Sequence, residues 1–251
     1  MSSSKDFTIV MMNRRYSSWS MRGWLGLCQC IDKSDFDTVM INLAGATTST
    51  PGFLPRSDIL KYSPSGKAPA LIDHKLGVTV YESFAIVLHL ADRFPQANLL
   101  PTDPSARAMC LSACAEMHAG FNGLRNNLPH HCLTTGYKHG AIAFTKKEVQ
   151  DDINRLGILW TELRTKYGSD GDFLFGSFGA ADCMYAPVSV RFMTYDPELK
   201  TLANYPIAQQ YIHTLYNMNN LQEWIEEAKK EGPDTYLDYY ELVSDTYPTS
   251  T

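Results

Sequence analysis

The residues from Ser63 to Ile86 combine types that could hold a small peptide by its backbone and its carboxylate. The run S-P-S-G-K-A-P-A-L-I-D, followed after a short gap by V-Y-E-S-F-A-I, predicts a loop, a strand, a turn, a second strand and the start of a helix. Pro69 suits the first residue of that strand because proline has no N–H to donate to a neighbouring strand. A cis Ala68–Pro69 bond would cost only ~1 kcal/mol and would leave the Ala68 N–H and C=O free for another peptide-like molecule.

The second half of this segment predicts an anion site. Glu82 and Ser83 open the helix, where backbone N–H groups and the helix dipole attract a carboxylate. A strand edge and an ordinary capped helix are the alternative interpretations of the two features taken singly. Together, at this spacing, they favour a site for a small peptide with a free carboxylate.

A hydroxyl group that could act on a thiol stands earlier, in the loop Y-S-S-W-S. A dithiol protein would carry cysteines at Ser17 and Ser20, so this chain cannot exchange disulfides with its own sulfur there. A Ser17 hydroxyl at a helix N-terminus can instead donate a hydrogen bond to a bound thiolate and lower the pKa of that thiol. The alternative is that Ser17 is a helix N-cap, which serine suits equally well.

The elements that must position these residues fall into two patterns. The first predicts the order β-α-β-α-β-β-α, which is the thioredoxin-like plan with its reactive group in the loop after the first strand. Strands are expected at 7–12, 39–43, 70–73 and 78–81, and helices at 20–31 and 83–94, with at most a short helix within 51–62.

The second pattern is entirely helical and follows a linker, 95–104, that carries three prolines. Helices are expected near 105–128, 144–167, 181–195, 205–217 and 219–231. The sequence therefore predicts a thioredoxin-like domain at 1–94 and an all-helical domain at 105–251 that ends in a Tyr-rich, acidic tail from Gly232.

Composition narrows the class of protein. The chain has 251 residues, 44% of them apolar, and a net charge of -5, which argues against a binder of nucleic acid or of membrane surfaces. No apolar run approaches the roughly 20 residues of a membrane span, and the N-terminus lacks an apolar signal core. A cytoplasmic protein is expected.

The six cysteines are interpreted as small core residues rather than as a disulfide framework or a metal site. The chain contains no C-x-x-C, no H-E-x-x-H and no phosphate-binding glycine loop. The adjacent pair His130 and His131 would point apart on a helix. No metal is expected.

Four segments resemble the cytosolic glutathione S-transferases. Y-S-S-W-S-M-R-G-W-L is similar to the serine-type motif of bacterial, fungal and zeta-like members, and S-G-K-A-P-A-L to the family's cis-proline loop. Y-E-S-F-A-I resembles its acidic-Ser site, and F-L-F-G-S-F-G-A-A-D-C its helical-domain motif. The resemblance covers nearly the whole chain and implies a thioredoxin-like domain followed by a helical bundle.

The resemblance also implies roles for single residues. Ser17 would face the sulfur of glutathione, with Tyr16 and Ser18 as alternatives. Ala68, beside Pro69, would pair its backbone with the cysteinyl part. Glu82 and Ser83 would bind the γ-glutamyl group, and Lys67 the glycyl carboxylate, although the family often has Gln there.

In the helical-domain motif, Gly176 and Asp182 would help to fold a helix and have no catalytic role. Gly179 stands where the family usually has Ser or Thr as an N-cap, so a modest loss of stability is expected.

The expected helix near 105–128 would face the first domain. Met117, Phe121 and Leu124 lie near one face of it and could line a pocket for an apolar co-substrate; the alternative is that they form plain interdomain core. His118 is interpreted as a core or surface histidine.

The leading function is a glutathione transferase, associated in its family with detoxification, that activates the thiol for attack on an electrophile. One alternative is a glutathione-dependent cis–trans isomerase of a maleyl-type diacid, for which Arg14 and Arg15 could bind the diacid. Trp19 stands where zeta-type members have Cys, which weakens this alternative. The second alternative is a non-catalytic module that binds glutathione or another ligand. The family resemblance implies a homodimer, and the tail could cover a partner subunit or be disordered.

Overall fold

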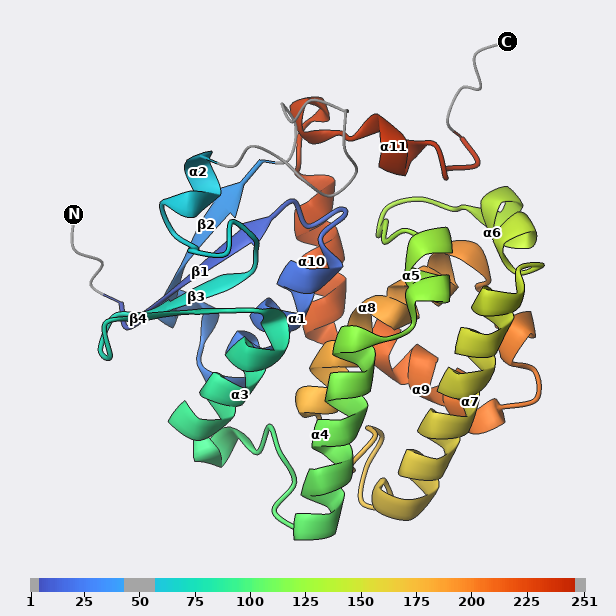
Figure 1. Ribbon diagram of the computed structural model, residues 1–251, viewed down its shortest axis with the longest axis horizontal. Coiled ribbons are helices and arrows are strands. Elements are labelled where there is room, and N and C mark those ends of the chain that lie inside the picture. The colour runs from blue at the N-terminus through green and yellow to red at the C-terminus, as the bar shows by residue number, and fades with distance from the viewer. Residues whose placement is uncertain (1–4, 43–56, 247–251) are drawn as a thin grey trace.

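A computed structural model describes residues 5–42 and 57–246, and its first part is built on a four-stranded sheet (Figure 1). The strands are β1 (Phe7–Met12), β2 (Phe36–Ile41), β3 (Ala70–Asp73) and β4 (Val78–Tyr81). The helices are α1 (Ser18–Cys30), α2 (Ser57–Leu60) and α3 (Ser83–Arg93). This order confirms the thioredoxin-like plan.

The sheet has the strand order β2-β1-β3-β4. β1 runs parallel to β2, with Phe7 opposite Phe36, and antiparallel to β3, which pairs antiparallel with β4. All six residues of β1 are buried, as expected of a central strand with both faces covered. β2 begins three residues earlier than the hydrophobic run 39–43 predicts, because Phe36 is buried and already pairs with β1.

The second part contains only helices. They are α4 (Pro104–Ala119), α5 (Asn122–Asn127), α6 (Tyr137–Ala143), α7 (Lys147–Tyr167), α8 (Ala180–Tyr195), α9 (Pro206–Tyr216), α10 (Asn219–Lys229) and the single turn α11 (Asp238–Glu241). Four of the five predicted helices match α7, α8, α9 and α10. The short helix α6 was not predicted. None of the helices in the described ranges is long and apolar enough to cross a membrane.

The helix predicted near 105–128 is wrong in one respect, because the chain breaks it into α4 and α5. α4 ends at Gly120, where a Cβ atom would lie 2.8 Å from the carbonyl oxygen of Glu116. Phe121 then adopts a left-handed backbone conformation with φ 55°. Nη1 of Arg125 turns back and donates to the carbonyl oxygens of His118 and Gly120, which satisfies the open end of α4.

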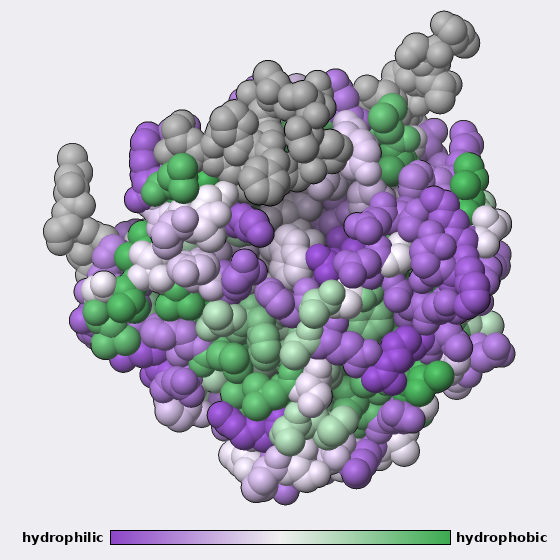
Figure 2. All heavy atoms as spheres, viewed as in Figure 1, coloured by the Kyte–Doolittle hydropathy of each residue, from purple (hydrophilic) through white to green (hydrophobic). Residues whose placement is uncertain are grey.

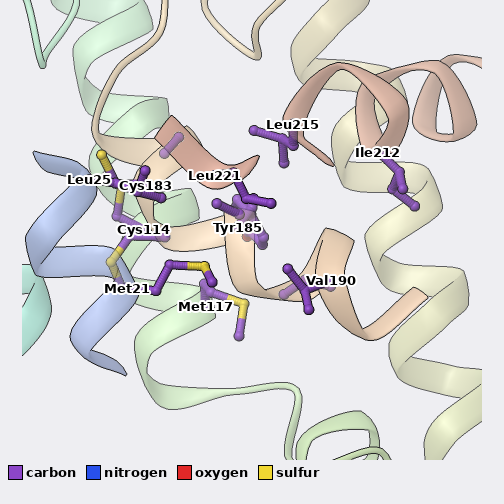
Figure 3. Close-up of a cluster of buried hydrophobic side chains, with 14 of the residues drawn as sticks. Met21, Leu25, Cys114, Met117, Cys183, Tyr185, Val190, Ile212, Leu215 and Leu221 are labelled. Atoms are coloured by element: carbon purple, nitrogen blue, oxygen red, sulfur yellow. The ribbon is translucent and has the colours of Figure 1, made fainter. Parts of the chain in front are cut away.

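A single hydrophobic core joins the two parts. Met21 and Leu25 of α1 lie beside Cys114 and Met117 of α4 and Cys183 of α8 (Figure 3). The contact is also polar, because Nε of the buried Arg22 donates to the carbonyl oxygen of Met184 at 2.9 Å.

The six cysteines are all free thiols. Four are buried, and Cys28 and Cys30 are half-buried and pack against the core. Their interpretation as core residues is confirmed.

Candidate functional site

The loop before β3 has the backbone geometry that the sequence predicts. The Ala68–Pro69 peptide bond is cis. Pro69 packs closely on α1, since a Cβ atom added to Gly23 would lie 3.3 Å from Cγ of Pro69. Ala68 is half-buried, and among the described residues its backbone has no hydrogen-bond partner. Lys67 beside it is exposed, and its N–H donates to Oγ of Ser65 at 3.2 Å.

The N-terminus of α3 carries two unusual features. Glu82, the N-cap residue, has φ 69° and ψ 123°, a backbone region that glutamate rarely adopts and that occurs most often at functional sites. Ser83, the first helical residue, is 1% exposed, and its Oγ has no hydrogen-bond partner among the residues that the structure describes. A buried hydroxyl without a partner is rare in proteins, so this helix end is suited to an additional ligand.

His118, interpreted from the sequence as a core or surface histidine, lies against this helix end. Nε2 of His118, in the last turn of α4, is 3.7 Å from Oε2 of Glu82. Its ring meets the ring of Trp19 edge to face, with centroids 5.4 Å apart. Burial lowers the pKa of His118, the Glu82 carboxylate opposes this, and Arg22 and Arg125 lower the pKa further. No sequence spacing relates His118 to Glu82, because the contact forms between the two parts of the chain.

The loop after β1 places Ser17 as the N-cap of α1. Its Oγ accepts a hydrogen bond from the Ser20 N–H at 3.3 Å and donates to Oγ of Ser20 at 2.7 Å. Oγ of Ser20, which is fully buried, also accepts from the Met12 N–H at 3.1 Å. The capping alternative is therefore correct, and the contact of Ser17 with a sulfur stays a prediction.

Tyr16 is turned toward the C-terminal segment. Its hydroxyl donates to the Glu241 carboxylate, and its ring is 3% exposed. Burial raises the pKa of Tyr16, and the hydrogen bond to Glu241 raises it further. Ser18 begins α1 and is buried. Tyr16 is a poor alternative to Ser17 as the donor to a sulfur, because the Tyr16 hydroxyl already donates its proton to Glu241.

The described part of the tail, 232–246, folds back onto its own chain. Nε2 of His131 lies 3.0 Å from the Glu241 carboxylate, and Nη1 of Arg15 lies 3.6 Å from it. The Arg15 guanidinium also stands over the Tyr236 ring, 4.0 Å from its centroid. Asp245 accepts hydrogen bonds from the first N–H groups of α6. Figure 1 shows this segment in red, beside the β1–α1 loop and α6.

The arginine pair considered for a diacid is engaged elsewhere. Arg15 pairs with Glu241, and the Arg14 backbone N–H donates to Oε1 of Glu231 at 2.6 Å. The Arg14 guanidinium lies 5.5 Å from the ring centroid of Trp224.

The assignment of a co-substrate pocket to Met117, Phe121 and Leu124 is not supported. Their exposed fractions are 0%, 5% and 0%, and all three belong to the continuous core. Met117 lies beside Met21 of α1 (Figure 3). The core alternative fits them better: Met117 meets α1, while the Phe121 ring lies against the Tyr185 ring of α8, with centroids 6.4 Å apart, and Leu124 belongs to α5, which packs on α7.

The helical-domain motif has the structural role that was expected of it. Asp182 is fully buried and accepts hydrogen bonds from the Gly179 N–H at 2.8 Å, the Leu174 N–H at 3.2 Å and the Tyr211 hydroxyl at 2.7 Å. Burial raises the pKa of Asp182 to about 6, and these hydrogen bonds oppose the rise. Gly179 is required here, since a Cβ atom would lie 2.8 Å from the carbonyl oxygen of Leu99.

The molecular surface is hollowed between the sheet part and α5, and mainly hydrophilic residues surround the hollow (Figure 2). In the described ranges, no group of three or more His, Cys, Asp or Glu side chains is arranged to hold a metal ion.

Sequence comparison finds similar proteins across much of the chain, although no family model matches. Glutathione S-transferase F14 of Arabidopsis thaliana is 26% identical over 206 residues, which are 80% of this chain and 72% of the relative. Glutathione S-transferase Z2 of the same plant is 33% identical over 92 residues, only 37% of this chain and 38% of the relative. A stringent starvation protein A homolog of Coxiella burnetii is 27% identical over 137 residues, 55% of this chain and 58% of the relative.

Solved structures share the fold. A Tau class glutathione S-transferase from mango, Mangifera indica, has a TM-score of 0.63 at 17% identity and covers 95% of this chain and 99% of its own. Ure2p in complex with glutathione has a TM-score of 0.63 at 15% identity and covers 90% and 96%. The chain is thus similar in sequence to glutathione S-transferases and shares the fold of solved members of that family.

Proposed function

We propose that this protein binds glutathione and activates its thiol for attack on an electrophilic co-substrate. The observation that carries the proposal is the buried, unpartnered Oγ of Ser83 at the N-terminus of α3, beside Glu82 in its left-handed conformation. The γ-glutamyl carboxylate would accept from Ser83 and from the first N–H groups of α3. The Glu82 carboxylate would pair with the γ-glutamyl amine.

The rest of the tripeptide would extend from this helix end across the loop before β3. The backbone of Ala68 would pair with the cysteinyl residue, and Lys67 would approach the glycyl carboxylate. Ser17 would then meet the sulfur at the N-terminus of α1, where the helix dipole also favours a thiolate. Several proteins with this fold have been solved with glutathione bound, which supports the proposal.

Calorimetric titration with glutathione tests the binding step. The variant Ser83→Ala is expected to bind about tenfold more weakly, a loss of about 1.4 kcal/mol, because a charge-assisted hydrogen bond disappears. Ser112→Ala is the matched control, since Ser112 is exposed and its hydroxyl donates to the Ala108 carbonyl of its own helix. If the wild-type protein binds neither free nor immobilised glutathione, the proposal is wrong.

A glutathione-binding protein without turnover is the second candidate. It is favoured by one observation, the donation of the Ser17 proton to Ser20 instead of to an open site. Conjugation of a generic aryl halide separates the two candidates, because only the transferase accelerates the reaction. A fall of less than about threefold in Ser17→Ala would exclude a catalytic role for Ser17.

The isomerase alternative is less well supported. Trp19 stands where that branch has Cys, the Arg15 guanidinium pairs with Glu241, and the Arg14 guanidinium lies over the Trp224 ring. A homodimer and a cytoplasmic location are further expectations from the family, and light scattering of the purified protein tests the first of them.

A further inference from the structure

Four cationic or potentially cationic side chains gather where the two parts of the chain meet. Arg22 comes from α1, Arg125 from α5, His130 from the segment after α5, and Arg191 from α8. Arg22 and His130 are each 1% exposed, Arg191 is 5% exposed and Arg125 is half-buried. We call these four residues the cationic cluster.

Within residues 5–42 and 57–246, two members of this cluster, Arg22 and His130, have buried nitrogen atoms without a hydrogen-bond partner. Nε of Arg22 is bonded to the Met184 carbonyl, but its Nη1 and Nη2 have no partner in the described part of the chain. Neither ring nitrogen of His130 forms a hydrogen bond of ordinary geometry, although the Tyr16 backbone lies near enough to raise its pKa. Buried charged donors without acceptors are strongly unfavourable.

No carboxylate among residues 5–42 and 57–246 forms an ion pair with a member of the cluster. Asp152 attracts Arg125 from a distance, but its Oδ2 accepts a hydrogen bond from the Leu124 N–H at 2.8 Å. Glu241 is paired with Arg15 and His131. Arg191 donates to the carbonyl oxygens of Leu128 and Pro187, which are neutral acceptors.

The members of the cluster also repel one another. The pKa of Arg22 is lowered by burial and then by Arg191 and Arg125. Burial also lowers the pKa of Arg191 to about 10 and that of His130 well below its ordinary value, and for His130 both Arg191 and Arg22 add to the effect. An anion bound among these groups would remove the repulsion and accept their free hydrogen bonds.

The cluster adjoins the place proposed for the sulfur of glutathione. Trp19 stands two residues after Ser17. The guanidinium carbon of Arg22 lies 4.2 Å from the centroid of the Trp19 ring, and that of Arg125 lies 4.6 Å from it. The same ring contacts His118, which faces Glu82. Trp19 therefore links the place proposed for the sulfur with the guanidinium groups of Arg22 and Arg125.

We infer that the co-substrate is an electrophile that carries a carboxylate, and that Arg22, Arg125 and His130 bind this carboxylate. The inference rests on the proposed glutathione transferase function and replaces the expectation of a purely apolar co-substrate. The carboxylate would accept from Nη1 and Nη2 of Arg22, from the donors of Arg125 that do not cap α4, and from the N–H of a neutral His130. Trp19 would lie against the apolar body of the molecule.

Two aryl chlorides that differ only in charge test the inference: 4-chloro-3-nitrobenzoate and its methyl ester. In both reactions the thiol proton of glutathione goes to solvent, the sulfur bonds to the ring carbon, and chloride leaves with the electron pair of the C–Cl bond. Each kcat/KM is divided by the uncatalysed rate with glutathione at the same pH, which corrects for the different reactivity of acid and ester.

The wild-type protein is expected to favour the acid over the ester by at least tenfold after this correction. Arg125→Gln is expected to lower the acid-over-ester ratio by about tenfold, and Arg22→Lys, which keeps the charge, to lower it less. Arg107→Gln is the matched control, because Arg107 is exposed on the first turn of α4. The ratio, unlike the rate itself, is insensitive to a loss of folded protein.

Two results would overturn the inference. The first is a corrected acid-over-ester ratio near or below one for the wild-type protein. The second is an equal loss of the acid and ester rates in Arg125→Gln, which would mean that the arginine acts on the sulfur. Calorimetry with unreactive 3-nitrobenzoate on the glutathione complex gives a readout without turnover. If glutathione binds and 3-nitrobenzoate does not, the inference fails and the proposed function stands; if glutathione itself does not bind, both fail.

Discussion

Removal of the Ser17 hydroxyl should raise the pKa of bound glutathione. Ser17 donates to Ser20 at 2.7 Å, so its proton can reach a sulfur only if the pair reverses. Ser20 permits this reversal: its Oγ accepts from the Met12 N–H and from Ser17, and no acceptor for its own proton is found in the described part of the chain. Once a thiolate binds, Ser20 would donate to Ser17, and Ser17 to the sulfur.

The expected size follows from this single hydrogen bond. A hydrogen bond to a charged group contributes about 1.5–3 kcal/mol, and each pKa unit corresponds to about 1.4 kcal/mol. The variant Ser17→Ala should therefore raise the pKa of the bound thiol by about one to two units. Ser20→Ala should raise the pKa of the bound thiol less, because Ser17 can still donate to the sulfur although it no longer accepts a hydrogen bond from Ser20.

The assay is a pH titration of thiolate absorbance in the glutathione complex of each protein. Ser17→Thr keeps the hydroxyl and should leave the pKa near the wild-type value. Ser17→Ala also loses an N-cap, which costs about 1 kcal/mol of stability, but the titration reports only on folded, liganded protein. A bound thiol whose pKa is the same in Ser17→Ala and in the wild type would refute the reasoning and leave Ser17 as a cap only.

Three further predictions concern stability. Glu241→Gln should speed amide hydrogen exchange over 232–246 by about tenfold, or about 1.4 kcal/mol, because the ion pair with Arg15 is lost. Unchanged exchange would show that the Glu241 carboxylate does not stabilise this segment. Gly179→Ser should lower the free energy of unfolding in urea by about 1–3 kcal/mol, although serine is the better N-cap, because its Cβ would crowd the Leu99 carbonyl; a stabilised variant would refute this. Burial raises the pKa of Asp182 in the folded state to about 6. The protonated carboxyl therefore stabilises the fold fully at low pH, and this stabilisation of about 3 kcal/mol is lost as the pH rises from about 4 to 6. The difference in unfolding free energy between the wild type and Asp182→Asn should fall over that range, and a difference that stays constant would exclude the shift.

Sequence predicted best what neighbouring residues decide together. The cis bond at Pro69 and the helix start at Glu82 and Ser83 follow from local turn and capping chemistry, and both are present. The succession of strands and helices along the first part of the chain was also predicted, because each strand carries its own hydrophobic run. The break at Gly120 was not, since the helical periodicity of the apolar residues continues through it.

The remaining errors arise where distant segments meet. Met117 and its neighbours form an apolar face, but the pattern does not show whether a ligand or another helix covers it. Arg22, Arg125 and His130 come from three segments and have no common spacing, so only the folded chain brings them together. The contact of His118 with Glu82 was missed for the same reason.

The shared core between α1, α4 and α8 limits how the protein can be recombined with its relatives. Met21 and Leu25 pack against side chains of the helical part, and Arg22 is bonded to its backbone. A chimera joined in the linker 95–104 would pack the α1 surface of one protein against the α4 and α8 surfaces of another. The buried Met21 and the Arg22 guanidinium would then face side chains whose shapes do not fit them. Substitutions on the inner face of α1 are therefore tolerated only together with compensating changes in α8, so the two halves must evolve as one unit.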